Sequence, residues 1–568
     1  MSQPWFERES ELLEWELDRF GMHNLPAEID EQARVHGRLV IHSRLLYRDA
    51  EIEIEAHYPD ETPELPPVIF GPVGLLDRHE HAFNGNFCLL ERPLDDWPAA
   101  TWGAADLIAD RLIALLRDSE AGPDAVRAAE APMPEPHSSY YTYPFPSLVL
   151  MPESLASPER ESGTLSLRPF AGEPTRFVVE SVSGTPGGSE ILAAIRVDDK
   201  ISAQWKRLAT PPPGPNAEDV LRWVRTEHPQ MIKPPVPPKL ANSRWLEPQR
   251  MQVAAFMFSE EGPGVGEMRD AWLFLCVPPA GRPFLAHCQV TSVAERQRRT
   301  PGLEALAGAR VLVVGLGTLG ADAATEFAKA GVGHLDLVDF DRYEINNSVR
   351  HVLGVEWSGF AKTQAVSETC RRLNPYCQPA PHNIHLGSVQ WSGESSLAEL
   401  EELVGQADLV VETTGSHQIQ NLLGRVARAA RVPMVSCWLT AGFYGAHVLR
   451  IVPGDTACMV CVARALSANE LLEAERGPDD QVIAQGCSHP TVPGAGFDAA
   501  ETAAIATRLA VQTLLREAEY PDSLWDHAAI SFFRAPSDPI FPRFATEHLE
   551  PTEGCPQCSS AVGSTTGL

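Results

Sequence analysis

The sequence has few cations relative to anions and lacks any long apolar run. Lysine and arginine total 46 against 76 aspartate and glutamate residues, giving a formal net charge of −30. Nucleic-acid binding depends on clustered cations, so this balance excludes nucleic acid as the main partner. No stretch approaches the roughly 18 consecutive apolar residues that a membrane-spanning helix needs, and the start lacks the apolar core of a signal peptide. We therefore expect a cytoplasmic protein with no membrane partner.

Length and cysteine content set further bounds. The 568 residues, 44% of them hydrophobic and 21% charged, predict a globular chain of several domains at about 150 residues each. The 11 cysteines are an odd number spread over a long chain. In a reducing compartment such cysteines are buried, metal-bound or reactive, and they are seldom paired.

Changes of pattern divide the chain into three blocks. Residues 1–120 combine helical and strand periodicities, which predicts an α+β domain. Residues 121–295 begin as a proline-rich linker and continue with short strand patterns, so we expect a β-rich middle domain without a cluster of reactive side chains. Residues 296–568 open with a strand, a helix and a second strand, which predicts an α/β domain with a Rossmann-like sheet.

The third block begins with a phosphate-binding pattern. Gly315, Gly317 and Gly320 form GxGxxG between an apolar strand and a helix, and the next strand ends in DFD at Asp339 and Asp341. Glycines let the backbone approach phosphates at the helix N-terminus, and Asp339 is placed to bind a ribose hydroxyl. On these features alone a nicotinamide oxidoreductase is the ordinary interpretation.

The residues that follow favour a nucleoside triphosphate instead. NNSVR places Asn347 and Arg350 just beyond the second strand, and Lys362 follows. An enzyme that handles a triphosphate needs cations, because charge builds on the α-phosphate and on the leaving pyrophosphate. Hydride transfer has no such need. Solvated surface side chains are the plain alternative.

Two CxxC pairs in the third block predict a metal site. They supply four thiolates, enough to close a tetrahedral structural zinc site. A redox role is the alternative, but two such motifs in one domain favour the metal. The four are Cys458, Cys461, Cys555 and Cys558.

From about Arg296 to Cys558 the chain resembles the ThiF/MoeB and ubiquitin-activating enzyme superfamily, through GLGTLG, DFD, NNSVR, Lys362 and the CxxC pairs. The resemblance implies ATP and Mg²⁺ as cofactors, adenylation of the C-terminal glycine of a ubiquitin-like protein, and a homodimer. It also implies an arginine that reaches into the other subunit's site, either Arg296 or Arg299. The nucleotide-binding residues it implies are Asp339, on ribose, and Asn347, Arg350 and Lys362, on the phosphates.

One position departs from the family pattern. In DLVVETTGS the family commonly has an aspartate that holds Mg²⁺, and this chain has Gly415. We expect Glu412, three residues earlier, or a water molecule to replace that ligand.

The transferring members of the family also use a nucleophilic cysteine ahead of a helix. GCSHPTVPGAGF places Cys487 in a polar loop before a long helical pattern. A thiolate there attacks the acyl adenylate and forms a thioester, and His489 or the helix N-terminus would lower its pKa. A spare loop cysteine is the alternative.

The first block resembles a ubiquitin-conjugating enzyme domain over nearly its full length. The order of elements matches, and NGNFCL surrounds Cys88, which on this resemblance accepts the activated partner by thioester exchange. The family's His-Pro-Asn triplet is absent, and Glu80 stands at the corresponding spacing. His79 or His81 is then the candidate to assist an oxyanion or an incoming amine. An inactive variant that only binds is the alternative.

A conjugating domain followed by an activating domain resembles the bacterial fusion enzymes of CBASS antiphage operons. That resemblance implies ATP-dependent joining of a ubiquitin-like protein, or of a cGAS-like nucleotidyltransferase C-terminus, to target protein amines. A sulfur-carrier adenylyltransferase is the second candidate and leaves the first block without a role. A nicotinamide oxidoreductase and a non-catalytic adaptor are the remaining alternatives.

Overall fold

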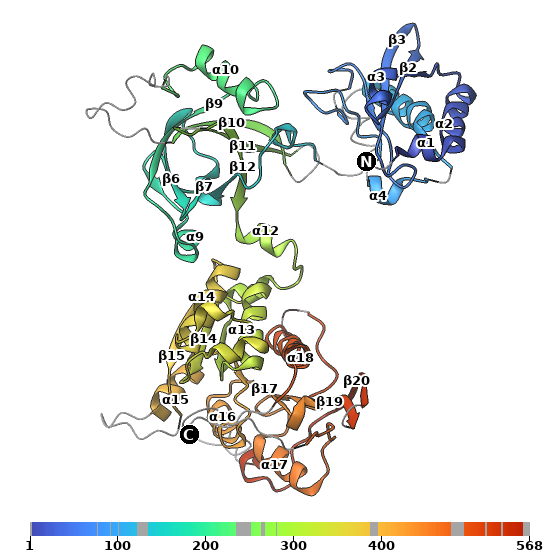
Figure 1. Ribbon diagram of the computed structural model, residues 1–568. Coiled ribbons are helices and arrows are strands. Elements are labelled where there is room, and N and C mark those ends of the chain that lie inside the picture. The colour runs from blue at the N-terminus through green and yellow to red at the C-terminus, as the bar shows by residue number, and fades with distance from the viewer. Residues whose placement is uncertain are drawn as a thin grey trace. The chain divides into compact units, whose positions relative to one another are not determined.

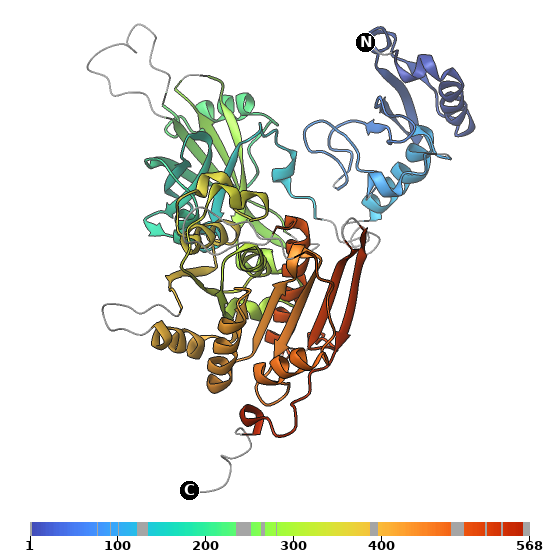
Figure 2. The same ribbon diagram turned by 60° about the horizontal axis from the view of Figure 1, so that its bottom comes forward.

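The computed structural model contains three β-sheets in two compact units (Figures 1 and 2). The first unit is Met1–Gly188 with Val197–Thr291, and the second is Ser189–Arg196 with Ser292–Leu568. The described residues are 3–76, 78–90, 92–99, 101–121, 134–233, 251–262, 267–279, 281–386, 396–478, 493–516, 518, 520–535 and 538–559.

The first unit begins with an antiparallel four-stranded sheet. Its strands are neighbours in chain order: β1 (Glu28–Ile29), β2 (Leu39–Tyr47), β3 (Ala50–Tyr58) and β4 (Val68–Phe70). The alternation EIEIEAHY buries Ile52, Ile54 and Ala56 on one face of β3, as the sequence predicts. These side chains join one core with helices before and after the sheet. The helices are α1 (Trp5–Arg8), α2 (Ser10–Met22), α3 (Glu31–Val35), α4 (Pro93–Asp96), α5 (Ala104–Asp106), η1 (Leu107–Leu112) and α6 (Ile113–Ala121).

A buried carboxyl joins α2 to α5. Glu16 is 1% exposed and accepts hydrogen bonds from the Tyr58 hydroxyl, at 2.9 Å, and from the Ala104 amide, at 3.2 Å. Burial raises the pKa of Glu16 to about 7. In the unfolded chain this carboxyl loses its proton near pH 4.5. The folded state therefore binds one proton more than the unfolded state between these two values, and stability falls as the pH rises through that window.

We expect Glu16→Gln to remove this pH dependence, because the amide keeps an acceptor oxygen and cannot ionise. Between pH 5 and pH 8 the midpoint temperature of the unfolding transition of the first unit should fall by several degrees in wild type. In the variant it should fall much less. Thermal unfolding of the full chain measures both, with the exposed Glu11→Gln as the matched control. An equal fall in wild type and Glu16→Gln would show that Glu16 ionises freely.

The second sheet closes into a barrel. β5 pairs with both β12 and β7, so the order β5-β12-β11-β10-β9-β6-β7 returns to its start. The interior holds bulky side chains that include Trp205, Trp272 and Phe274, while α10 (Ala217–Glu227) covers Phe256 on the outside. The strands are β5 (Leu148–Pro152), β6 (Ser162–Phe170), β7 (Glu173–Val182), β8 (Thr185–Pro186), β9 (Ile201–Arg207), β10 (Gln252–Glu261), β11 (Met268–Val277) and β12 (Phe284–Thr291); shorter helices are η2 (His137–Tyr140) and α8 (Glu153–Ala156).

The second unit is a mixed α/β domain, as the sequence predicts. Five parallel strands run in the order β15-β14-β13-β16-β17, and three antiparallel strands, β18, β19 and β20, extend the sheet. The bounds are β13 (Arg310–Val314), β14 (His334–Asp339), β15 (Gln378–Asn383), β16 (Leu409–Glu412), β17 (Met434–Leu439), β18 (Gly445–Ile451), β19 (His527–Ala535) and β20 (Asp538–Glu547).

Helices cover both faces of this sheet, which is why its central strands are apolar throughout (Figure 1). Val311 and Val313 face one hydrophobic cluster, and Leu312 and Val314 face the other. On the first side lie α13 (Thr318–Ala330), α14 (Lys362–Leu373) and α18 (Gly496–Leu514), and on the second lie α15 (Ser396–Gln406), α16 (His417–Ala430) and α17 (Met459–Ala468). Among the described helices, none is both long and apolar enough to cross a membrane.

Candidate functional sites

The glycine motif forms a tight loop between β13 and α13. Gly315 has a φ of +90°, a left-handed conformation that favours glycine. A Cβ on Gly320 would lie 1.8 Å from the Gly315 carbonyl oxygen, so only glycine fits there. Gly317 is the N-cap of α13, and no described side chain caps that helix. The first amides of α13 are therefore open to an anionic ligand.

Asp339, Asp341 and Lys362 meet beside this loop. One Asp339 oxygen accepts the Leu316 amide at 2.6 Å, and the other accepts the Asp341 amide at 2.8 Å. The Lys362 ammonium lies 2.5 Å from the Asp341 carboxylate. The structure thus brings these predicted residues together at the carboxyl ends of β13 and β14, where α/β sheets bind ligands.

Arg350 and Asn347 lie on the next segment, at η4 (Ile345–Val349). The Arg350 guanidinium lies 5.4 Å from the centre of the Phe443 ring, and burial lowers its pKa. The Asn347 side-chain oxygen accepts the Glu344 amide at 3.0 Å, which fixes the start of η4.

Sequence reasoning missed His351 at this site. Its Nε2 lies 3.0 Å from the Leu316 carbonyl, and its Nδ1 accepts the Leu353 amide at 3.2 Å. Burial lowers the pKa of His351 to about 4, so the ring is neutral at neutral pH. His351 therefore joins the glycine loop to the segment that carries Arg350. Its position directly after Arg350 was the one sequence feature that could have indicated a role at this site.

Glu412 is fully buried at the end of β16. Its Oε2 accepts the Ser436 hydroxyl at 2.6 Å, and its Oε1 accepts the Thr414 amide at 2.8 Å. Burial raises its pKa. This arrangement does not favour Glu412 as a magnesium ligand, because its oxygens hold two neighbouring segments together. Gly415 has a φ of +69°, a conformation in which an aspartate would be strained.

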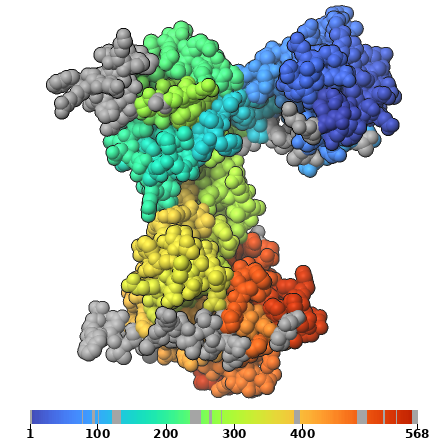
Figure 3. Space-filling view, in the orientation of Figure 1, coloured from blue at the N-terminus to red at the C-terminus, as the bar shows by residue number. Residues whose placement is uncertain are grey.

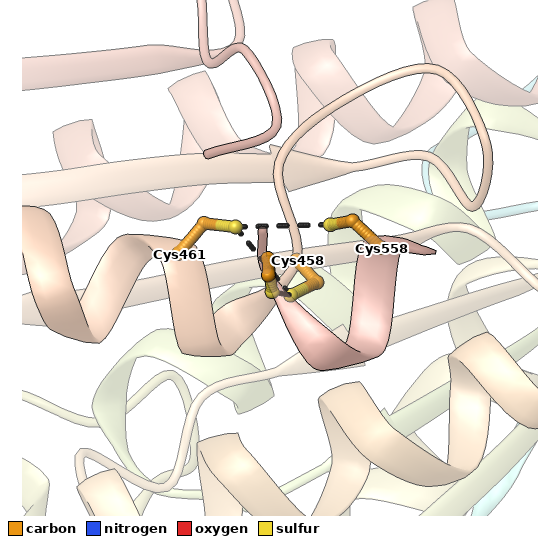
Figure 4. A group of neighbouring side chains, drawn as sticks. Cys458, Cys461 and Cys558 are labelled. Carbon is orange, nitrogen blue, oxygen red and sulfur yellow. Dashed lines mark hydrogen bonds between the residues drawn. The ribbon is translucent and has the colours of Figure 1, made fainter. Parts of the chain in front are cut away.

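The four cysteines of the CxxC pairs form one cluster, as the sequence predicts. The sulfur separations are 3.8 Å for Cys458 to Cys461, 3.6 Å for Cys458 to Cys555 and 3.7 Å for Cys461 to Cys558. All four sulfurs lie within 4.8 Å of one another. Figure 4 shows the sulfurs of Cys461 and Cys558 pointing toward each other across the start of α17 and the short helix α19 (Pro556–Ser559). Metal–sulfur distances of about 2.3 Å imply tetrahedral edges of about 3.8 Å, so the cluster fits a zinc ion.

Cys88 lies on an exposed loop of the first unit. Its amide donates to the His79 carbonyl at 2.7 Å, and its sulfur lies 3.6 Å from the Leu90 carbonyl. Glu80 is buried instead, and its carboxylate accepts the amides of Gly74 and Leu76. The residue at the His-Pro-Asn spacing therefore shapes the preceding turn.

The two candidate histidines have different neighbours. His79 donates its amide to both oxygens of Glu135, at 2.9 Å, and its Nδ1 lies 3.2 Å from that carboxylate. The His81 ring lies 4.7 Å from the ring of Tyr140, and burial lowers its pKa. Burial and the nearby Glu135 carboxylate raise the pKa of the Cys88 thiol. Sequence reasoning missed Glu135 and Tyr140, because they follow a linker and belong to no motif.

Three predicted site residues, Cys487, Arg296 and Arg299, are not part of the sites described above. Cys487 lies outside the described residues, although α18 starts at Gly496 where a helix was predicted. Arg296 lies in α12 (Val293–Gln297), and Arg299 follows that helix.

The ThiF family pattern matches residues 292–531. The chain is 33% identical to the molybdopterin-synthase adenylyltransferase of Escherichia coli, over 31% of this chain and 67% of that protein. It is also 30% identical to ubiquitin-like modifier-activating enzyme 5 of Dictyostelium discoideum, over 29% of this chain and 44% of that protein. The glycine loop, its acidic and basic neighbours and these likenesses agree: the chain belongs to the ThiF family.

Two further similarities concern the chain beyond the family match. An uncharacterized protein of Sinorhizobium fredii, y4oA, is 26% identical over 94% of this chain and 96% of its own length. This relative therefore spans nearly the whole chain, including most of each of the three sheets. Escherichia coli MccB superposes with a TM-score of 0.35 at 17% identity, over 46% of this chain and 74% of that one, which is too weak to bear on function.

We expect two substitutions in the glycine loop to separate folding from nucleotide binding. A Cβ on Gly317 meets no atom within 4 Å, so Gly317→Ala should fold and lose at most a few degrees of unfolding temperature, the cost of alanine in place of glycine at a helix N-cap. It should still weaken ATP binding by about tenfold, because the methyl group stands where a phosphate approaches. Gly320→Ala should lose both stability and binding. Calorimetry and thermal unfolding measure them, and unchanged ATP affinity in Gly317→Ala would place the phosphates elsewhere.

Proposed function

We propose that the protein activates the C-terminus of a small protein by adenylation and passes it through thioesters to a target amine. The single observation that carries this proposal is the glycine loop with its uncapped helix and the flanking Asp339, Lys362 and Arg350, in a chain of the ThiF family. ThiF adenylyltransferases use ATP. The conjugation step is supported by Cys88, which is exposed on a loop of the first unit after its antiparallel sheet, and by the resemblance of the first block's sequence to ubiquitin-conjugating domains.

In the proposed first step the amides at the start of α13 bind phosphate oxygens. Asp339 binds the ribose, and Asn347, Lys362 and Arg350 face the charge that develops on the α-phosphate and the leaving pyrophosphate. The carboxylate of the small protein attacks the α-phosphorus, and pyrophosphate leaves. The Lys362 ammonium, now paired with Asp341, would exchange that partner for a phosphate oxygen. Mg²⁺, where bound, neutralises phosphate charge.

In the proposed second step two cysteines carry the acyl group. Cys487 attacks the acyl adenylate, releases AMP and holds the small protein as a thioester. The Cys88 thiol then exchanges with that thioester, and a target amine finally takes the acyl group. The small protein is a ubiquitin-like protein or the C-terminus of a cGAS-like nucleotidyltransferase, and the setting is cytoplasmic antiphage defence.

A homodimer is part of this proposal. Ile345, Val349 and Val355, beside the nucleotide loop, are 59%, 78% and 58% exposed. Apolar side chains that stand out together next to a functional segment are typical of an interface. The second copy of this chain is the proposed occupant.

The direct test is an ATP-dependent thioester on each cysteine. The full chain with Mg-ATP and lysate of the source bacterium should give an adduct that thiols release, seen on non-reducing gels and located by mass spectrometry. Cys88→Ala should leave the adduct on Cys487, and Cys487→Ala should remove it from both. Cys288→Ala, half-buried in the barrel, is the matched control. Consumption of ATP without an adduct on either cysteine would contradict conjugation.

A sulfur-carrier adenylyltransferase is the second candidate. The likeness to molybdopterin-synthase adenylyltransferase, at 33% identity, favours it for the second unit alone. That activity needs no cysteine in the first unit. The Cys88→Ala variant distinguishes the two, because sulfur transfer should not respond to its loss.

We also propose that the four-cysteine cluster binds zinc and stabilises the end of the second unit. The Thr552 amide donates to the Cys461 sulfur at 3.3 Å, a contact that favours the thiolate. Protein purified without chelator should contain about one zinc ion per chain by elemental analysis. Cys555→Ser should lose it and unfold at a lower temperature, whereas Cys288→Ser should keep it. A metal-free wild type with full stability would contradict the assignment.

A further inference from the structure

The segment that precedes the barrel contacts the loop of Cys88. The Arg78 guanidinium pairs with Glu261 of β10 at 2.7 Å, and the Glu135 amide donates to the same carboxylate at 2.8 Å. Glu135 in turn accepts the His79 amide on both oxygens. The His79 carbonyl accepts the Cys88 amide. The backbone of one residue, His79, therefore links the Glu135 carboxylate, through its N–H, to the Cys88 amide, through its carbonyl.

The groups around the thiol leave a net negative site. The Glu135 carboxylate and the Tyr140 hydroxyl both interact electrostatically with the Cys88 thiol. The Tyr140 hydroxyl also interacts with the charges of Arg78 and Glu261. Arg78 is engaged with Glu261, and burial keeps His81 neutral at neutral pH by lowering its pKa. The imidazole ring of His79 contacts the Glu135 carboxylate itself. A carboxylate beside a thiol disfavours the thiolate, so Glu135 does not activate Cys88 as a nucleophile.

The same carboxylate suits the opposite half of the reaction. Once the sulfur is acylated it carries no charge, and the anion beside it attracts a cation. The amine of a lysine side chain approaches as an ammonium ion and must lose its proton before it attacks. A carboxylate in contact with it both binds the ammonium and accepts that proton.

We propose that Glu135 is the acceptor-amine residue of the Cys88 site: it binds the ammonium group of a target lysine beside the thioester and takes its proton during attack. This inference rests on the proposed conjugation function and specifies that the group which accepts the acyl chain is the amine of a lysine side chain. The middle region of the chain thereby supplies part of the conjugating site, through Glu135, Tyr140 and Glu261.

The step balances without any further reactant. The lysine nitrogen forms a bond to the thioester carbonyl carbon, and the bond from that carbon to the Cys88 sulfur breaks. Glu135 accepts the first ammonium proton and returns it to solvent. The departing sulfur takes up the second nitrogen proton, which restores the thiol.

Glu135→Gln tests the inference, because the amide keeps an acceptor for the His79 N–H and loses the charge. Cys88 of the full chain is acylated with a short peptide thioester, without ATP, and the acyl group on the Cys88 peptide is followed by mass spectrometry. Discharge by a lysine derivative should slow by at least about tenfold, the low end for general base catalysis. Discharge by hydroxylamine, which is uncharged at neutral pH, should be unchanged. Glu159→Gln, an exposed carboxylate of the same unit, is the control.

Alkylation of the free Cys88 thiol supplies a second readout that needs no acyl group. At neutral pH it should be faster in Glu135→Gln than in wild type, because the thiolate is more populated. Unchanged lysine discharge, an equal slowing for both nucleophiles, or unchanged alkylation would each overturn the assignment. If both readouts behave as expected while ATP never charges Cys88 in wild type, the proposed function fails and the amine site stands.

Discussion

The close approach of Gly320 to the Gly315 carbonyl is the constraint on which the second unit depends. It lets the chain reverse between β13 and α13, and it brings the ends of three strands to one place. The Thr413 hydroxyl, just after β16, donates to the Gly315 carbonyl at 2.6 Å, and Asp339, at the end of β14, accepts the Leu316 amide. A side chain at Gly320 would strike both the carbonyl and that hydroxyl. The packing of the sheet and the geometry of the ligand loop are therefore one arrangement.

Local patterns predicted most of this unit from sequence. The glycine spacing, the apolar strands and the paired CxxC motifs each act over a few residues, and the four thiols do meet although the two pairs are far apart in the chain. Glu412 shows the limit. Its burial depends on Ser436, on the neighbouring strand β17, and on the turn at Thr414. Sequence spacing does not show such a cross-strand partner. Glu412 was therefore expected to bind Mg²⁺ near the glycine loop, whereas its carboxylate is buried and hydrogen-bonded within the protein.

The first unit shows the same limit more strongly. The alternating strand 50–58 and the flanking helices follow from periodicity, and an exposed cysteine after an Asn-Gly turn could be singled out. Glu80 stood at the position of a functional residue, yet its carboxylate satisfies two turn amides. Glu135 could not be foreseen, because a linker and the pairing of Arg78 with β10 decide where it lies. Sequence spacing therefore identified the Cys88 thiol as the candidate reactive group but did not identify the residues around it.

The environments of the thiols suit different tasks. The four clustered cysteines are held within bonding distance of a common centre, where a metal would keep them ionised. Cys88 is an exposed residue, but the protein atoms around its sulfur partly desolvate it. That desolvation and the Glu135 carboxylate raise the pKa of the thiol, so it is a poor nucleophile toward unactivated carbonyls. In the proposed scheme Cys88 attacks only an activated carbonyl, that of the thioester on Cys487. A thiol that is rarely ionised also resists oxidation. The same carboxylate that suppresses the free thiolate then favours the cationic acceptor, so one charge acts on both halves of the transfer.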